Sequence, residues 1–198
     1  MKRTAVCLLI AALCLGLAGC ASPPAPERAA DGAEWGEGWV TVGGVVGVDT
    51  PGGMTSRENN EALAAKGMYY AAWSMGEGEP YTNEDGGEAT LYDAQVYLLL
   101  GGCESGEEAR DTTAQWLEMA QTRYAINGTA EAAHNGQAFS LITYTFDGDA
   151  NPYVRGASAF GTYRNYAISV EFVCREGFSG DAGELLAQFL DNCHYAAP

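Results

Sequence analysis

The sequence predicts an α+β domain in which an antiparallel β-sheet is sandwiched between a long central helix and a C-terminal helix. Three patterns support this prediction. From Trp39 onward, short segments rich in β-branched and aromatic residues alternate between apolar and polar positions, as strands do. Two segments, 105–124 and 181–193, instead repeat apolar residues every three or four positions, as amphipathic helices do. Glycine-rich and Asn-Gly turns between the strand segments indicate short antiparallel connections.

The part of the domain before the central helix is expected to be mostly strand. Four strands are expected there, at 39–42, 45–49, 68–75 and 91–100. Gly43-Gly44 between the first two predicts a hairpin. Segment 56–66 begins with a serine and is followed by Gly67, which predicts a short helix. The stretch 76–90 is rich in Gly, Glu and Asp and is expected to be a loop.

The central helix is expected to begin after Ser105 and to end near Tyr124, because serine is a good N-cap and Glu107 and Glu108 complement the helix dipole. Strands return after Asn127-Gly128. The Asn135-Gly136 pair then predicts a hairpin. Two further strands, 153–160 and 166–174, complete an antiparallel meander.

The C-terminal helix is expected to open at Asp181, since Glu184 three residues later makes a capping box. Its apolar stripe contains five residues: Leu185, Leu186, Phe189, Leu190 and Cys193. The strand before it should place one set of residues on a single face: Tyr166, Ile168, Val170, Phe172 and Cys174.

This order of elements, together with YAISVEFVC followed by ELLAQFLDNCHY, resembles the α/β/α sandwich of PsbP-type extrinsic photosystem proteins and of bacterial lipoproteins that share that fold. The resemblance covers residues 39–196 and implies a PsbP-like fold. It implies nothing about activity, because no motif matches a photosystem-binding residue of that family.

The composition is that of one folded domain with a strong negative charge. The chain has 198 residues, 47% of them apolar and 18% charged, which excludes disordered, collagen-like and coiled-coil classes. Ten basic residues against 26 acidic ones give a net charge of −16. That field repels phosphate backbones, so nucleic acid is not an expected partner. We expect a monomer.

The N-terminus has the organisation of an export signal. Lys2 and Arg3 precede an apolar run, 4–16, that is shorter than the roughly 20 residues needed to span a bilayer. Leu17-Ala18-Gly19-Cys20 follows and resembles the lipobox of bacterial lipoproteins, in which the cysteine is acylated and becomes the new N-terminus. The alternative is an ordinary secretory signal whose small residues form the cleavage site.

The lipobox resemblance implies a protein anchored by lipid to a cell membrane and facing outside the cytoplasm. Cys20 would carry diacylglycerol and a fatty acyl chain such as palmitate. Two or three acyl chains hold a protein permanently, at about 0.8 kcal/mol per buried CH2. Loss of Lys2 and Arg3 leaves 8 basic residues against 26 acidic ones, a net charge of −18. This charge keeps the domain away from anionic headgroups, so the lipid is the expected attachment.

Three parts of the chain are therefore expected. Residues 1–19 are the signal peptide, and residues 20–38 are the lipidated cysteine with a Pro- and Ala-rich tether. The 18 tether residues 21–38 span at most about 50 to 60 Å when fully extended. Residues 39–198 form the single α+β domain.

The sequence contains no strong catalytic or metal motif. There is no HExxH, CxxC, P-loop or GxGxxG pattern, so no cofactor and no metal is expected. The segment 156–161 is one residue too long for a G-x-S-x-G elbow and lies in an expected strand. His134 lies at the Asn135-Gly136 turn and is expected to be solvated. His194 follows Cys193 directly, and adjacent helical residues project about 100° apart, which disfavours a dyad.

Two acidic stretches are weak candidates for cation binding. Residues 147–151 have the D-x-D-x-N opening of a calcium loop, but Pro152 and Ser158 occupy positions that an EF-hand gives to Gly and Glu. The 77–88 loop carries five acidic residues: Glu77, Glu79, Glu84, Asp85 and Glu88. A hairpin turn and a solvated acidic loop explain these stretches equally well.

Three cysteines remain in the domain after the signal and Cys20 are set aside. An odd number permits at most one internal disulfide. Cys174 and Cys193 are the better candidates for that bond, because both lie on expected core-facing stripes, whereas Cys103 does not. Free buried cysteines behaving as small apolar residues explain the same pattern.

The aromatic residues are candidates for a sugar- or peptide-binding platform, or for ordinary packing. Six of them are the candidates for such a platform: Trp35, Trp39, Tyr69, Tyr70, Tyr153 and Tyr163.

Taken together, the sequence favours a membrane-anchored, non-catalytic binding domain of unknown ligand. The alternative is a hydrolase with a carboxylate-based active site in a cleft of the same domain, since paired carboxylates leave no local motif. Glu171 and Asp93 are the pair that would favour it. A hydrolase should have a pocket of about 300 to 1,000 Å³, whereas a binding module should have grouped exposed aromatics or an unpaired sheet edge.

Overall fold

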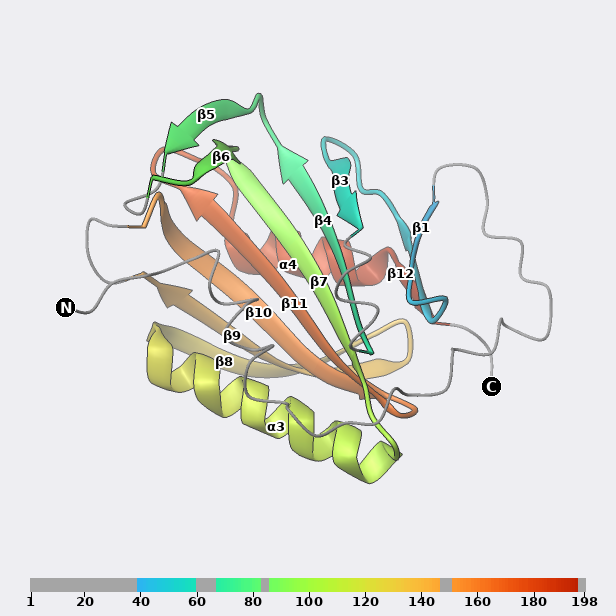
Figure 1. The fold of residues 1–198 in the computed structure, drawn as a ribbon. Coiled ribbons are helices and arrows are strands. Elements are labelled where there is room, and N and C mark those ends of the chain that lie inside the picture. Colours follow the sequence, from blue (N-terminus) through green and yellow to red (C-terminus); the bar gives the residue numbers. More distant parts are fainter. Residues whose placement is uncertain (1–38, 60–66, 83–85, 147–150, 196–198) are drawn as a thin grey trace.

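The structure, a computed structural model, describes residues 39–59, 67–82, 86–146 and 151–195. Its centre is a seven-stranded antiparallel sheet with the order β3-β4-β7-β11-β10-β9-β8 (Figure 1). The strands are β3 (Thr55–Asn59), β4 (Met68–Met75), β7 (Ala94–Gly102), β8 (Ala125–His134), β9 (Gln137–Thr145), β10 (Tyr153–Tyr163) and β11 (Tyr166–Arg175). The predicted antiparallel sheet is confirmed.

Two smaller sheets flank the main one. A three-stranded sheet has the order β1-β2-β12 and is formed by β1 (Trp39–Val42), β2 (Val46–Asp49) and β12 (Cys193–Tyr195). A two-stranded hairpin is formed by β5 (Glu79–Thr82) and β6 (Glu88–Leu91). The three-stranded sheet extends the core of the main sheet. Val42, Val46 and Val48 belong to the same buried cluster as the core residues of the main sheet.

Two helices accompany the sheet in the described part of the chain, α3 (Gly106–Arg123) and α4 (Ala182–Asp191). They lie on opposite faces of the main sheet (Figure 1). Leu186 and Phe189 of α4 pack on the face that carries Phe172, whereas Trp116 of α3 packs on the face that carries Ala167. No described helix is both long enough and apolar enough to cross a membrane.

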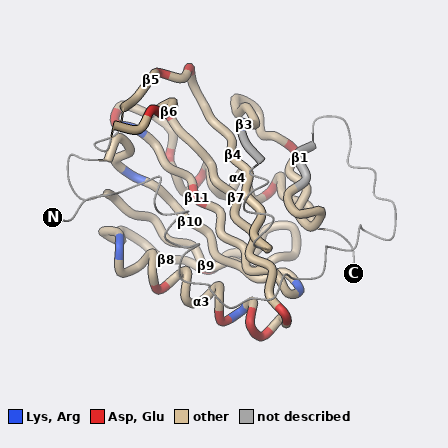
Figure 2. Tube along the Cα trace, viewed as in Figure 1, with Lys and Arg blue, Asp and Glu red and all other residues tan. Residues whose placement is uncertain are grey.

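Both helix starts are where the sequence predicts them. The Ser105 side chain accepts a hydrogen bond from the Glu108 amide at 3.1 Å, and Asp181 accepts one from the Glu184 amide at 2.9 Å. Each bond satisfies an amide that has no partner inside its helix. Figure 2 shows acidic residues gathered at the start of α3, where the helix dipole favours negative charge.

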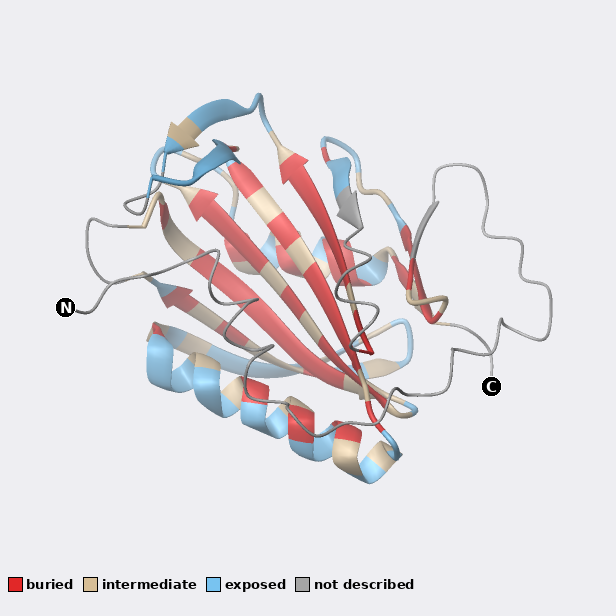
Figure 3. Cartoon of the chain, in the orientation of Figure 1, coloured by how far each residue is buried: buried red, intermediate tan, exposed pale blue. Residues whose placement is uncertain are grey.

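The central strands are buried on both faces because a helix covers each side. In β11 the predicted set from Tyr166 to Cys174 belongs to the core under α4. Figure 3 shows buried residues running along β4, β7, β10 and β11, while β5, β6 and the outward surface of α3 are exposed. The Asn135-Gly136 turn has the predicted positive φ angles, 48° and 78°, and joins β8 to β9.

Several predictions of local structure were wrong. The expected helix at 56–66 is a strand as far as Asn59, and residues 60–66 lie outside the described residues. Segment 55–59 pairs with β4, and this pairing overrides the helical pattern of its sequence. The Arg57 side chain adds a contact to β4, because it donates a hydrogen bond to the Ser74 hydroxyl at 2.7 Å. The expected loop 76–90 contains the β5-β6 hairpin, so Leu91 ends β6 and the next strand begins at Ala94. Cys193 lies in β12 beyond α4, not on the helix.

Candidate functional site

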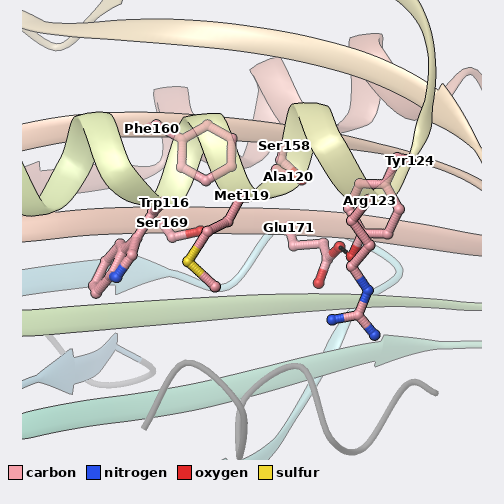
Figure 4. Close-up of a pocket in the computed structure, with 9 residues that line it drawn as sticks. All are labelled: Trp116, Met119, Ala120, Arg123, Tyr124, Ser158, Phe160, Ser169 and Glu171. Atoms are coloured by element: carbon pink, nitrogen blue, oxygen red, sulfur yellow. Dashed lines mark hydrogen bonds between the residues drawn. The ribbon is translucent and has the colours of Figure 1, made fainter. Parts of the chain in front are cut away.

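A small pocket lies between the C-terminal half of α3 and strands β10 and β11 (Figure 4). We call it the α3 pocket, and its lining residues are Trp116, Met119, Ala120, Arg123, Tyr124, Ser158, Phe160, Ser169 and Glu171. Its cavity volume is about 60 Å³, which is room for a few water molecules. Pockets for small-molecule substrates begin at roughly 300 Å³, so the α3 pocket accommodates a group rather than a whole substrate.

Helix and strand periodicity bring these residues together. Four residues of α3 follow the spacing i, i+3, i+4 and i+7 and so share one helix face, and Tyr124 is the C-cap that follows them. On the sheet, Ser158 lies directly opposite Glu171 and Phe160 directly opposite Ser169 in the β10-β11 pair. Alternate residues of both strands therefore face α3.

The walls of the pocket are mostly apolar. The Trp116 ring lies over Gly101, where a Cβ would be only 2.9 Å from it, so the absence of a side chain at Gly101 lets the indole pack onto the sheet. Met119 is 48% exposed and is the one exposed large hydrophobic side chain in the described part of the protein. An apolar surface therefore leads from solvent into the pocket.

The Glu171 carboxyl group is the acidic group of the pocket. One of its oxygens, Oε1, accepts hydrogen bonds from the Tyr144 hydroxyl at 2.5 Å and the Tyr124 hydroxyl at 3.1 Å. Burial raises the pKa of Glu171, while these two bonds and the nearby Arg123 charge lower it. The net direction is upward, so folding favours the protonated acid relative to the unfolded chain.

The two tyrosines form a rigid wall behind Glu171. Their rings stack with centroids 4.1 Å apart and planes 8° apart, and the Tyr144 hydroxyl also shares a 3.2 Å hydrogen bond with Ser158. Burial, followed by the negative charge of Glu171, raises the pKa of both hydroxyls. They therefore remain hydrogen-bond donors to the carboxyl group at neutral pH.

The second carboxyl oxygen, Oε2, has no hydrogen-bond partner among the described residues, and Glu171 lines the pocket. Arg123 lies at the mouth, with its guanidinium 5.8 Å from the Tyr124 ring centroid (Figure 4). It makes no ion pair with Glu171 within the described part of the chain. The pocket thus presents one carboxyl oxygen to whatever enters it.

The carboxylate pair considered for a hydrolase does not come together. Asp93 is exposed and is absent from the pocket lining, and its amide donates to the Met75 carbonyl at 3.1 Å. Glu171 is the one carboxylate that lines the α3 pocket. The described residues therefore place no second carboxylate in the lining of this pocket, as a carboxylate pair for glycoside hydrolysis would require.

His134 differs from the expected solvated loop residue. Its side chain is 11% exposed, and Nδ1 lies 2.7 Å from the Asp191 carboxylate at the end of α4. The neighbouring Asn135 side chain donates to the carbonyls of Asp191 and Cys193 at 2.7 and 2.8 Å. The β8-β9 turn is therefore docked against the end of α4, which local sequence patterns do not reveal.

The remaining sequence candidates are dispersed. Cys103, Cys174 and Cys193 are all free and buried, so the bond considered between the last two is not formed in this structure. Burial raises the pKa of all three thiols.

Cys20, Trp35 and residues 147–150 lie outside the described residues. Wherever the structure describes the chain, no three His, Cys, Asp or Glu side chains gather as a metal site would require.

Four of the six residues proposed for an aromatic platform have described side chains, and none of these four is exposed. Tyr70 and Tyr153 are buried, and Tyr69 and Tyr163 are half-buried. The aromatic side chains at the α3 pocket are Trp116, Tyr124 and Phe160 instead. Sequence reasoning missed this group. Its one available signal was Glu171, a charged residue in a strand expected to be covered by a helix on each face.

Comparison with known proteins gives remote similarities of structure. The chain is similar to cyanobacterial PsbP from Synechocystis sp. PCC 6803, with 9% identity and a TM-score of 0.39 over 73% of this chain and 94% of that one. It is similar to the extracellular domain of PknH from Mycobacterium tuberculosis, with 12% identity and a TM-score of 0.35 over 72% and 77%. No protein-family profile and no curated protein matches the chain by sequence. At these TM-scores neither similarity carries an argument about function.

Proposed function

We propose that this protein is a lipid-anchored bacterial lipoprotein of PsbP-like sandwich fold whose domain is a non-catalytic binding module. The α3 pocket is the observation that carries the proposal. It is open, mostly apolar and bordered by the exposed Met119, and it contains a single carboxylate. Such a pocket suits docking of a side chain or a small group of a partner.

The outer edge of β8 is a second feature that suits a binding module. β8 is the last strand of the main sheet, and its outer side has no paired strand among the described residues. The register of β8 against β9 shifts between Ile126 and Gly128, which marks a β-bulge. The seven residues that follow, Gly128 to His134, include neither proline nor lysine. Proteins usually protect such an edge with those residues; here the exposed Glu131 is the one acidic residue of the stretch, and the unpaired backbone groups suit the addition of a strand.

The anchor is tested by changing the proposed acylation site. Cys20→Ala should abolish the lipid and release or mislocalise the domain, because the acyl chains are the proposed attachment to the membrane. The measurement is membrane fractionation with mass spectrometry of the mature N-terminus. An unmodified protein that is still cleaved before residue 20 and still membrane-bound would refute the anchor.

The binding role is tested at the mouth of the α3 pocket. Membrane and medium components are captured with the full chain and with Met119→Asp, which changes an exposed residue and should leave the fold intact. A component retained by the parent, lost by Met119→Asp and kept by the exposed-site control Gln121→Glu supports the proposal. Turnover of a polymer or ester panel that is lost with Glu171→Gln would favour the carboxylate hydrolase instead.

A further inference from the structure

We propose that the α3 pocket binds an alkylammonium group, with the charged end at the free oxygen Oε2 of Glu171 and the alkyl part along the apolar wall. This inference rests on the proposed binding function and narrows it to one ligand chemistry. It is built on the hydrogen bonds of Glu171, the character of the pocket wall and the charge of the protein.

The hydrogen bonds of Glu171 leave a directed acceptor. Both tyrosine donors bind Oε1, at 2.5 and 3.1 Å, and they hold the carboxyl group in one orientation. Oε2 has no described donor, and Glu171 is one of the residues that line the pocket. A ligand that donates hydrogen bonds complements this oxygen, and a cationic donor also compensates the charge of the half-buried carboxylate.

The pocket wall suits the alkyl part of such a ligand. Trp116 lies at one end, Tyr124 and Arg123 lie at the other, and Phe160, Met119 and Glu171 lie between them (Figure 4). Aromatic faces attract ammonium groups. Methylene groups that contact Met119 and Trp116 are removed from water, which contributes favourable free energy to binding. The cavity of about 60 Å³ holds an ammonium group with its nearest methylenes but not a folded chain or a sugar ring.

The charge of the protein selects against anions at this place. The whole chain carries a formal net charge of −16, so its field raises the local concentration of cations and lowers that of anions. Arg123 is the cation that the chain itself places at the mouth, and its side chain is exposed and not paired with Glu171. It therefore acts as a weak competitor of an incoming ammonium group.

The test follows Met119 by NMR in the full chain, in detergent micelles, with 13C-methyl methionine. The probes are n-butylammonium, n-butanol and butyrate at constant ionic strength, and loss of a signal in Met119→Leu assigns the resonance. We expect butylammonium to shift this resonance saturably and to bind at least tenfold more tightly than butanol, with butyrate weakest. Glu171→Gln should reduce the affinity for butylammonium to that for butanol, since the amide still accepts from the tyrosines but carries no charge.

Two further variants keep the test decisive if Glu171→Gln folds poorly. Arg123→Gln removes the competing charge and should strengthen butylammonium binding, whereas Glu118→Gln changes an exposed carboxylate outside the pocket and should have little effect. Equal effects of Glu118→Gln and Glu171→Gln, or weaker binding by Arg123→Gln, would overturn the proposal.

The probes also separate this inference from the broader binding role. Equal affinity for butanol and butylammonium overturns the ammonium inference and leaves an apolar binding pocket. No shift with any probe overturns the ammonium inference and removes the pocket as support for the proposed function. A further arm with Nα-acetyl-lysine N-methylamide identifies the source: binding at least as tight as that of butylammonium indicates a partner's lysine, and much weaker binding indicates a free amine.

Discussion

The two faces of the main sheet bury different chemistry, although the same strands supply both. The face under α4 is almost wholly apolar, and its centre includes the Trp73 and Phe189 rings in an edge-on contact at 4.9 Å. The face toward α3 buries Ser158 and half-buries Glu171, and both side chains lie among tyrosines. In β11, successive residues belong to one face and then the other, so a one-residue shift of register would exchange the two environments.

A second polar network on the α3 face shows that this difference extends beyond the pocket. The side-chain oxygen of Gln95 accepts from the Tyr97 hydroxyl at 2.5 Å and from the Tyr153 hydroxyl. Tyr97 in turn lies opposite Glu171 in the β7-β11 pair. Buried polar groups are tolerated when they satisfy one another, and networks of this kind fix side-chain positions. The α4 face therefore stabilises the fold, and the α3 face has the chemistry of a site.

The largest expected effect is a charge placed on the α4 face. Phe189→Asp should abolish folding, because an unpaired carboxylate in this core costs several kcal/mol, a large part of the stability of a domain. Leu186→Asp should do the same. Circular dichroism and thermal melting measure the loss, and the neighbouring exposed position, changed as Gln188→Asp, should melt like the parent. A normal melt for Phe189→Asp would mean that α4 does not pack on the sheet.

A smaller loss is expected on the α3 face. Trp116→Ala should destabilise the domain by about 3 kcal/mol, because it removes a buried ring beside a pocket that is already partly open. Denaturant unfolding measures the change, and Trp116→Phe, which retains an aromatic ring, should recover part of it. A loss as large as that of Phe189→Asp would contradict the contrast between the two faces.

The third prediction concerns pH and distinguishes the faces by titration. Burial raises the pKa of Glu171 in the folded protein, so the folded state keeps a proton that the unfolded chain loses. The protonated Glu171 therefore stabilises the folded state fully at a pH below the pKa of Glu171 in the unfolded chain, which is about 4.3. This stabilisation is lost as the pH rises through the pKa of Glu171 in the folded protein.

Glu171→Gln does not titrate and should remove this component of the pH dependence. Unfolding free energies measured from pH 4 to pH 8 for the parent and the variant provide the test. The stability of the parent relative to Glu171→Gln should fall as the pH rises. Glu118→Gln, an exposed change on α3, is the matched control. A relative stability that rises with pH would show that the carboxylate is stabilised by folding instead.

The smallest expected effect lies where the β8-β9 turn meets the end of α4. Asn135→Gly keeps the positive φ of 48° but removes the two side-chain bonds to the carbonyls of Asp191 and Cys193. The expected loss is about 1 kcal/mol, or about 2 to 4 °C in the melting temperature. An unchanged melting temperature would indicate that this contact adds nothing to the packing of α4.

Local patterns were sufficient where an element is specified by residues close in sequence. Ser105 and Asp181 marked the helix starts because a cap acts on amides three residues away. Asn135-Gly136 marked its hairpin because few residues adopt two successive positive φ angles. The core-facing set of β11 followed from strict alternation.

Local patterns failed where pairing with a distant strand decides the structure. Segment 55–59 is a strand because β4 lies beside it, and Cys193–Tyr195 is a strand because β2 lies beside it. The spacing of apolar residues in the first segment predicted a helix. The second segment was predicted to continue the C-terminal helix. Long-range backbone hydrogen bonds override weak intrinsic propensity in such short segments.

Four features follow directly from the order of the amino acids: the composition and charge, the central and C-terminal helices, the antiparallel character of the sheet, and the alternation that turns Glu171 away from the α4 core. The partners of Glu171, in contrast, depend on how distant elements pack together. Its two tyrosine partners come from 27 and 47 residues earlier in the chain, on β9 and at the end of α3. A buried carboxyl group needs donors from whichever elements surround it, and those neighbours are fixed by packing, which no local spacing encodes.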